Sequence, residues 1–427
     1  MQDEEPYVGP RAFKRDDRHL FFAREIEAND LLSLITAHRI VLFYARSGAG
    51  KSSLLNARLV PLLEEDGFMV LPVARVRPMD RELIEDVART TRTNIYVYSV
   101  LTCLSREAPP ESLLSRSLAE GLSSRPDEDE NPAPRVLIVD QFEELFTTGT
   151  WQDRRPFLLQ IAEILAGNPT LRVVLAMRED YIAELDPYAD LLPERLATRF
   201  RLEPLRREAA VLAVTRPLTV FERRFAPGVA ETLVANLLAS GELVEPVQLQ
   251  IVCQSLWRSA RELDAPEISQ AHLTQFGDVD QVLRRFYETS VERAVYISGV
   301  REGPLRRWLG EHLITPGGTR ASVWDTRGLP ERALFELQAD RLIDSEVRRG
   351  TRSYELSHER LIGAIQTSND EWRSRRLAED ETCQFLEARA AAWEEEGHPP
   401  RLLLAGNELE QAEAWLASPE AENLGVQ

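Results

Sequence analysis

Lys51 lies in a run of residues whose types and spacing suit the binding of a phosphate group. The run is Ala45-Arg-Ser-Gly-Ala-Gly-Lys51-Ser-Ser53, and of the 51 lysines and arginines in the chain only Lys14 and Lys51 are lysines. Glycines let backbone N–H groups turn toward an anion, a compact ammonium reaches the β- and γ-phosphates, and a serine hydroxyl binds Mg²⁺. We therefore predict a nucleotide site, with Mg²⁺ on Ser52, formed by Ser47, Gly48, Ala49, Gly50, Lys51, Ser52 and Ser53.

The elements around this loop have the order that such a site requires. Residues 39–44 form an apolar, β-rich run that ends at the loop, and residues 52–63 read as a helix. Four more apolar runs are predicted to be strands: 68–74, 135–140, 171–177 and 199–202. Because strands alternate with helical patterns, we predict an α/β P-loop NTPase domain, a parallel sheet flanked by helices, over residues 1–205.

The pattern after residue 205 is mainly helical. We predict an α-helical domain over residues 206–275, a winged-helix domain over 276–365 and a helical extension over 366–427. The winged helix is predicted from helices around a β-hairpin whose strands are 342–347 and 353–357. The polar, acidic and proline-rich residues 122–134 are predicted to form a surface loop.

The composition argues against several classes of function. A net charge of −19 opposes non-specific binding to nucleic acid or to anionic membranes. No apolar run approaches the roughly 18 residues of a membrane span, and the N-terminus lacks the pattern of a secretory signal. Cys103, Cys253 and Cys383 are widely spaced, which is typical of reduced thiols. We expect a cytoplasmic protein that binds neither a membrane nor nucleic acid.

A carboxylate downstream completes the predicted phosphate site. Arg135-Val-Leu-Ile-Val-Asp140 reads as a buried strand that brings Asp140 beside the metal ion on Ser52. The next residue, Gln141, can orient a water but cannot accept its proton. Glu143 and Glu144 follow within one helical turn, and either could act as a general base. The alternative is that both are ordinary first-turn acids favoured by the helix dipole.

Arg178 follows the predicted strand 171–177 directly. A cation at the tip of a strand near the phosphates could sense the presence of a γ-phosphate. The alternative is a surface ion pair with Glu179 or Asp180, and position alone favours that alternative.

Taken together, these motifs resemble the STAND class of signal-transduction NTPases, and within it the novel STAND branch of bacterial multidomain proteins. The most specific segment is Asp140-Gln-Phe-Glu-Glu-Leu-Phe146. The residues Tyr7-Val-Gly-Pro-Arg-Ala-Phe13, followed by Phe21-Phe-Ala-Arg-Glu-Ile-Glu27, are similar to the family segment near the adenine, with Ala23 in place of its usual glycine. The resemblance covers nearly the whole chain.

The resemblance implies roles for four further residues. Arg24 belongs to the segment near the adenine, and Pro246 to a helical segment whose proline packs near the base. Arg178 stands where the family has its phosphate-sensing arginine, which raises that reading above the ion pair. His358, in Tyr354-Glu-Leu-Ser-His358, stands where the family's histidine contacts the β-phosphate of ADP. The implied ligands are ATP or ADP and Mg²⁺.

These features favour a slow ATP hydrolase that acts as a switch. We expect ADP to hold the chain closed and ATP to open it for self-assembly, in bacterial signalling or defence against phage. The sensor and effector modules of the family are expected as separate partners or as deleted parts of the chain. One alternative is an origin-loader-like DNA-binding ATPase, supported by Arg348, Arg349 and Arg352 on the hairpin turn. Another is a pseudo-NTPase scaffold, supported by Gln141.

Overall fold

In the computed structural model the chain forms two compact units, the first of Met1–Phe276 with Val347–Thr351 and the second of Gly277–Glu346 with Arg352–Gln427. The described residues are 5–76, 94–105, 110–114, 116–123, 133–147, 151–238, 242–262, 266–277, 279–348, 351–358, 360–418 and 421. The predicted division into four domains stays a prediction.

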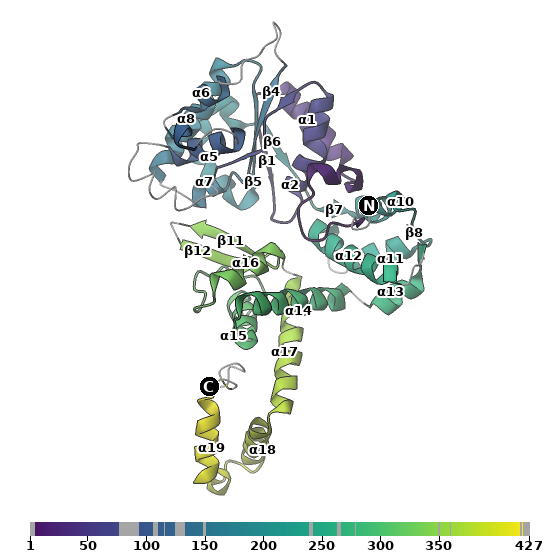
Figure 1. The fold of residues 1–427 in the computed structure, drawn as a ribbon, viewed down its shortest axis with the longest axis vertical. Helices are drawn as coiled ribbons and strands as arrows, with labels where there is room; N and C mark the ends of the chain where they lie inside the picture. Colours follow the sequence, from purple (N-terminus) through teal and green to yellow (C-terminus); the bar gives the residue numbers. More distant parts are fainter. Residues whose placement is uncertain are drawn as a thin grey trace. The chain divides into compact units, whose positions relative to one another are not determined.

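A parallel sheet forms the centre of the first unit (Figure 1). Its strands are β1 (Ile40–Ala45), β2 (Met69–Val70), β3 (Ala74–Arg75), β4 (Arg135–Asp140), β5 (Arg172–Arg178) and β6 (Arg199–Arg201). The order is β2-β4-β5-β1-β6, with β3 also paired to β4, and every pair is parallel. The predicted run 68–74 is divided into β2 and β3, since Pro72 between them has no N–H to donate to the ladder.

Helices cover both faces of this sheet, as the predicted α/β fold requires. On one face lie α1 (Glu25–Ala37) and α2 (Lys51–Leu54), and on the other α5 (Ile95–Leu104), α6 (Leu118–Ser123) and α8 (Trp151–Gly167). The helix α3 (Val60–Glu65) packs in the same hydrophobic cluster as α1 and α2. The predicted helix 52–63 is confirmed, with one π-helical turn at Leu55–Leu59. The predicted loop 122–134 begins too early, because α6 continues to Ser123, and residues 124–132 lie outside the described residues.

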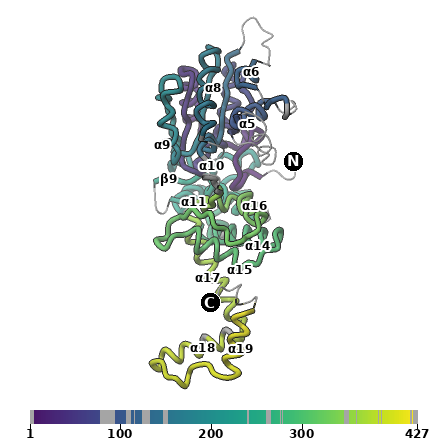
Figure 2. Tube along the Cα trace, turned by 90° about the vertical axis from the view of Figure 1, so that its left-hand side faces the viewer, coloured from purple at the N-terminus to yellow at the C-terminus, as the bar shows by residue number. Residues whose placement is uncertain are grey.

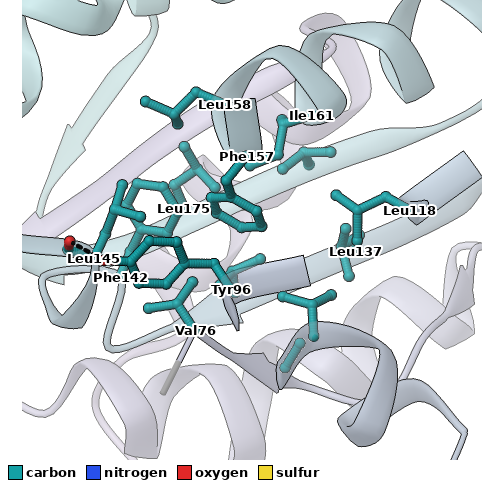
Figure 3. Packing of buried hydrophobic residues seen from close by; sticks show 14 of the residues in the cluster. Val76, Tyr96, Leu118, Leu137, Phe142, Leu145, Phe157, Leu158, Ile161 and Leu175 are labelled. Atoms are coloured by element: carbon teal, nitrogen blue, oxygen red, sulfur yellow. Dashed lines mark hydrogen bonds between the residues drawn. The ribbon is translucent and has the colours of Figure 1, made fainter. Parts of the chain in front are cut away.

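The strands β1, β4 and β5 each contribute side chains to two hydrophobic clusters, one on either face of the sheet. Ile40 and Leu42 of β1 pack in one cluster, whereas Val41 and Phe43 pack in the other. Figure 3 shows part of the first cluster, where Phe157 of α8 packs near Phe142 and Tyr96. A parallel sheet buried on both faces needs apolar residues at consecutive positions, which explains the uninterrupted apolar runs in the sequence.

The rest of the first unit is helical. Its helices are α7 (Glu144–Thr147), α9 (Ile182–Leu185), α10 (Arg207–Val220), α11 (Val229–Leu237), α12 (Pro246–Glu262) and α13 (Gln270–Phe276). Two short strand pairs lie among them: β7 (Leu205–Arg206) pairs with β9 (Leu243–Val244), and β8 (Arg224–Phe225) pairs with β10 (Glu267–Ile268). The residues 7–13, called here the N-terminal segment, pack on these helices. The Tyr7 hydroxyl donates to the Val214 carbonyl of α10 at 2.5 Å. The Val8 N–H donates to Gln250 of α12 at 3.0 Å.

The second unit contains most of the predicted hairpin, of which Val347–Thr351 belongs to the first unit. Its elements are α14 (Val279–Ser298), α15 (Glu302–Arg307), α16 (Glu331–Ala339), β11 (Ile343–Arg348), β12 (Thr351–Leu356), α17 (Leu361–Glu379), α18 (Glu381–Glu395) and α19 (Asn407–Leu416). The strands β11 and β12 pair after three helices, which is the order that we interpreted as a winged helix. Figure 2 shows the contacting helices α18 and α19 near the C-terminal end of the chain.

A buried arginine ties α17 to the preceding helices. Arg306 of α15 is 4% exposed, and its guanidinium donates to Glu302 at 2.7 Å and to Ser368 of α17 at 3.0 Å. Its charge also lies over the ring of Trp372, 5.5 Å from the centroid. Removing a partner of such a buried, hydrogen-bonded charge strongly destabilises a protein, so these contacts fix α17 in its unit.

No helix among the described residues has the length and apolarity needed to cross a membrane.

Candidate nucleotide site

The phosphate loop connects the end of β1 to the start of α2. Gly48 and Gly50 have φ angles of 77° and 95°, in the left-handed region that favours glycine. The ammonium of Lys51 donates to the Ala45 carbonyl at 3.2 Å, which folds the lysine back over its own loop. The loop therefore has the conformation in which backbone N–H groups and a lysine can surround an anion.

The predicted pair of metal ligands is in direct contact. The Ser52 hydroxyl donates to Asp140 Oδ2 at 2.7 Å, and Asp140 is 3% exposed. A hydroxyl and a carboxylate are the hard oxygen donors that Mg²⁺ prefers, together with waters and phosphate oxygens. The two residues thus fit a Mg²⁺ ion between the loop and β4.

The order of the strands brings the remaining acidic and basic residues to the same edge. β5 lies between β1 and β4, and Arg178 at its end is in register with Ala45 at the end of β1. Glu143 reaches this point from the segment after β4, where its Oε2 accepts the Arg178 N–H at 3.2 Å. Glu144 begins the short helix α7 instead.

Lys51 and Glu143 interact electrostatically in this site. Burial lowers the pKa of Lys51, and the negative charges of Glu143 and Asp140 oppose that shift. Burial raises the pKa of Glu143, and the nearby charge of Lys51 opposes it. A partly buried carboxyl whose pKa lies above its ordinary value is suited to proton transfer near neutral pH.

Arg178 forms an ion pair in this structure. Its Nε and Nη2 donate to one oxygen of Asp180, at 3.1 and 3.0 Å, and its side chain is 17% exposed. The sequence left an ion pair with Glu179 or Asp180 open as one role of Arg178, and the pair with Asp180 is present. In this geometry the guanidinium lies at the edge of the phosphate loop.

The residues expected near the base also meet beside the loop. The buried guanidinium of Arg24 donates to the carbonyls of Glu203 and Ala49, at 2.8 and 3.4 Å. A Cβ placed on Gly50 would lie 3.9 Å from Pro246 Cγ, so the start of α12 borders the loop. The Ser53 hydroxyl accepts the Phe13 N–H at 3.2 Å, which joins the N-terminal segment to α2.

The comparison with protein families agrees with these motifs and their geometry. The model of the family Novel STAND NTPase 1 matches residues 6–401. The chain belongs to this family. It is therefore a member of a P-loop NTPase family, and membership of that family implies nucleotide binding. No curated protein matches the chain.

Several solved structures are similar to this novel STAND NTPase. The ORC1 protein of Aeropyrum pernix in complex with DNA is 16% identical, with a TM-score of 0.47 over 86% of this chain and 98% of that one. A Walker-type ATPase of Pyrococcus abyssi is 18% identical, with a TM-score of 0.46 over 83% and 98% of the two chains. The ORC2 protein of Aeropyrum pernix is 13% identical, with a TM-score of 0.43 over 82% and 95%.

His358 of the novel STAND NTPase lies in the second unit. It is 4% exposed, between β12 and α17, next to Ser357, whose hydroxyl donates to the Arg341 carbonyl at 2.5 Å. Its contact with a nucleotide stays a prediction.

Sequence reasoning missed two backbone features of the site. Gln141 and Ala23 have φ angles of 55° and 68°, in the region that favours glycine. The left-handed turn at Gln141 lets the Phe142 N–H reach the Ala176 carbonyl of β5, at 2.8 Å. At Ala23 the family's usual glycine was a usable signal, since a glycine favoured at one position points to a positive φ.

Proposed function

We propose that this novel STAND NTPase is a slow ATP hydrolase that works as an ATP/ADP switch. The observation that supports this best is the meeting of Lys51, Ser52, Asp140, Glu143 and Arg178 at one edge of the sheet. Such a site can bind a nucleoside triphosphate, distinguish it from the diphosphate and activate a water.

Each side chain has a task in the proposed reaction. Lys51 binds the β- and γ-phosphates, and Ser52 with Asp140 would hold Mg²⁺, which neutralises phosphate charge when it is bound. Glu143 accepts the proton of the attacking water, and its position next to Lys51 and Arg178 favours it over Glu144. Gln141 orients that water without taking its proton.

The switch requires that the nucleotide is read by both units. In the proposed cycle ADP contacts His358 and holds the chain closed, and exchange for ATP adds a γ-phosphate that Lys51 and Arg178 bind. The chain then opens and assembles with further copies. Hydrolysis resets the state. The proposed setting is bacterial signalling or defence against phage in the cytoplasm, with sensor and effector modules as partners.

ATP turnover by four proteins tests the catalytic part of this proposal. Wild type is compared with Lys51→Ala, Glu143→Gln and Glu144→Gln. Loss of a general base lowers turnover by roughly 10²- to 10⁴-fold, so Glu143→Gln should fall by that amount. Glu144→Gln, the matched control one residue along, should stay close to wild type. Equal background hydrolysis by Lys51→Ala and wild type would favour the pseudo-NTPase scaffold instead.

The DNA-binding alternative has a weaker basis. It depends on the arginines around the hairpin turn, of which Arg349 lies outside the described residues. The net charge of −19 opposes it. Salt-sensitive binding in a mobility-shift assay would support it, because phosphate contacts release counterions.

A further inference from the structure

The turn after β5 pairs all three of its charged residues within the first unit. Arg178 donates twice to Asp180, at 3.1 and 3.0 Å. Glu179 between them accepts from Arg46 of the phosphate loop at 2.9 Å and from Arg201 of β6 at 3.0 Å. The tip of β5 is thus connected to the phosphate loop on one side and carries its own counter-ion on the other.

A buried aromatic contact holds this turn in place. Tyr181 follows Asp180 and is 4% exposed, and its ring stacks on Phe146 with centroids 6.5 Å apart and planes 13° from parallel. Phe146 belongs to α7, which follows Glu143. Since Tyr181 is fixed in the core, Asp180 stands at a defined place opposite the Arg178 guanidinium. The pair is therefore better positioned than two long side chains that meet on a surface.

The pair stands at the edge of the phosphate loop. Arg178 is in register with Ala45, whose carbonyl accepts the Lys51 ammonium at 3.2 Å. Both Arg178 and Asp180 act electrostatically on Lys51. A γ-phosphate bound by Lys51 would therefore lie within the field of both members of the pair.

We infer that Asp180 is a latch that holds Arg178 away from the nucleotide until a γ-phosphate competes for the guanidinium. The carboxylate carries one negative charge and is half exposed, with a relative side-chain exposure of 49%. The terminal phosphate of ATP carries more charge and more acceptor oxygens, so it can displace a single carboxylate oxygen. ADP has no such group and leaves the pair intact. Asp180 is thus a positioning residue that sets the preference for ATP over ADP.

The latch predicts an asymmetric effect of Asp180→Asn on the two nucleotides. This inference depends on the proposed function, because the chain must bind both. The loss of this ion pair should tighten ATP binding by about 1.4- to fivefold, which corresponds to the roughly 0.2–1 kcal/mol that an exposed ion pair contributes. ADP binding should be unchanged. The measurement is the dissociation constant of ATP and of ADP, by calorimetry on the full chain in Mg²⁺.

Three variants make the test specific. Asp180→Glu keeps the charge and should bind both nucleotides as wild type does. In an Arg178→Ala background Asp180→Asn should have no effect, since the pair is already broken. The control is Asp186→Asn, which removes a similar ion pair between Asp186 and Arg199, 2.8 Å long. Arg199 is in register with Leu42 of β1, three residues before Ala45, so this pair lies farther from the phosphate loop.

Each outcome decides the inference. An ATP effect that appears only with Arg178 present supports the latch. An equal change for ATP and ADP, no change for either, or an effect that persists in Arg178→Ala overturns it and leaves the proposed function standing. A wild-type chain that binds neither nucleotide overturns both. The half-exposed position of Asp180 makes loss of folding a poor explanation, and the thermal unfolding midpoint of each variant checks this.

Discussion

At the scale of single residues, the site brings charged groups together in a partly buried place, where burial disfavours the charged form of each group. Lys51 and Glu143 are both partly buried. Burial lowers the pKa of Lys51 and raises the pKa of Glu143, and in both cases it favours the uncharged form. Their mutual attraction opposes both shifts. The proposed function gives each group a task with the nucleotide, and the effect of the pair on stability should be measurable.

Glu143 predicts a dependence of stability on pH. Because its folded pKa is raised, the unfolded chain loses this proton at a lower pH than the folded chain does. Between the two pKa values the folded state binds more protons, so the free energy of unfolding falls as pH rises through this window. In Glu143→Gln this contribution should be absent. Urea unfolding at several values between about pH 4 and 8 measures it.

The control for this measurement is Glu231→Gln, which changes an exposed glutamate on α11. A plot of its free energy of unfolding against pH should run parallel to the plot for wild type. If the plot for Glu143→Gln also runs parallel to that for wild type, the raised pKa of Glu143 is contradicted.

At the scale of elements, the N-terminal segment and α12 form one side of the nucleotide site. Gly9 has a φ of 72°, and a Cβ there would lie 2.5 Å from Gln254 Oε1. The Gln254 side chain would have to move and give up its hydrogen bonds to Tyr7 and Glu5, at 3.2 and 3.0 Å. Because α12 begins at Pro246, beside Gly50, this contact supports the edge of the phosphate loop.

Gly9→Ala should therefore destabilise the chain more than Gly67→Ala does. Gly67 has a φ of 87° but nothing within 4 Å of its added Cβ, so it carries the same backbone strain without the collision. Two lost hydrogen bonds place the difference at about 1–3 kcal/mol in the free energy of unfolding. Urea denaturation of both variants measures it, and equal losses would show that the Gln254 contact contributes nothing.

Much of the element pattern could be predicted from the sequence. The strands β1, β4 and β5 were predicted to within one residue because buried parallel strands are continuous apolar runs. The positive φ of Gln141 was missed because it goes with a hydrogen bond from Phe142 to β5. The division at Pro72 was missed although a proline inside an apolar run is a signal in the sequence itself. The order of the strands was also out of reach, and it is this order that brings Arg178 beside Ala45.

At the scale of the whole molecule, the proposed switch joins two units. The first carries the phosphate loop, and the second carries His358, the buried arginine Arg306 and the helix α17 that follows them. The spacing of the glycines and Lys51 predicted the phosphate loop from the sequence, whereas the role of His358 came from the family resemblance and stays a prediction. The proposed coupling of the two units through a nucleotide is tested by a measurement on the full chain.

The most direct test is the molar mass of the full chain in two nucleotide states. Light scattering after gel filtration would be recorded in ADP and in a slowly hydrolysed ATP analogue, with Mg²⁺, for wild type and Lys51→Ala. The account predicts a small species in ADP, a larger assembly in the ATP analogue, and no response in Lys51→Ala. The same mass and the same elution volume of wild type in both nucleotides would contradict the switch.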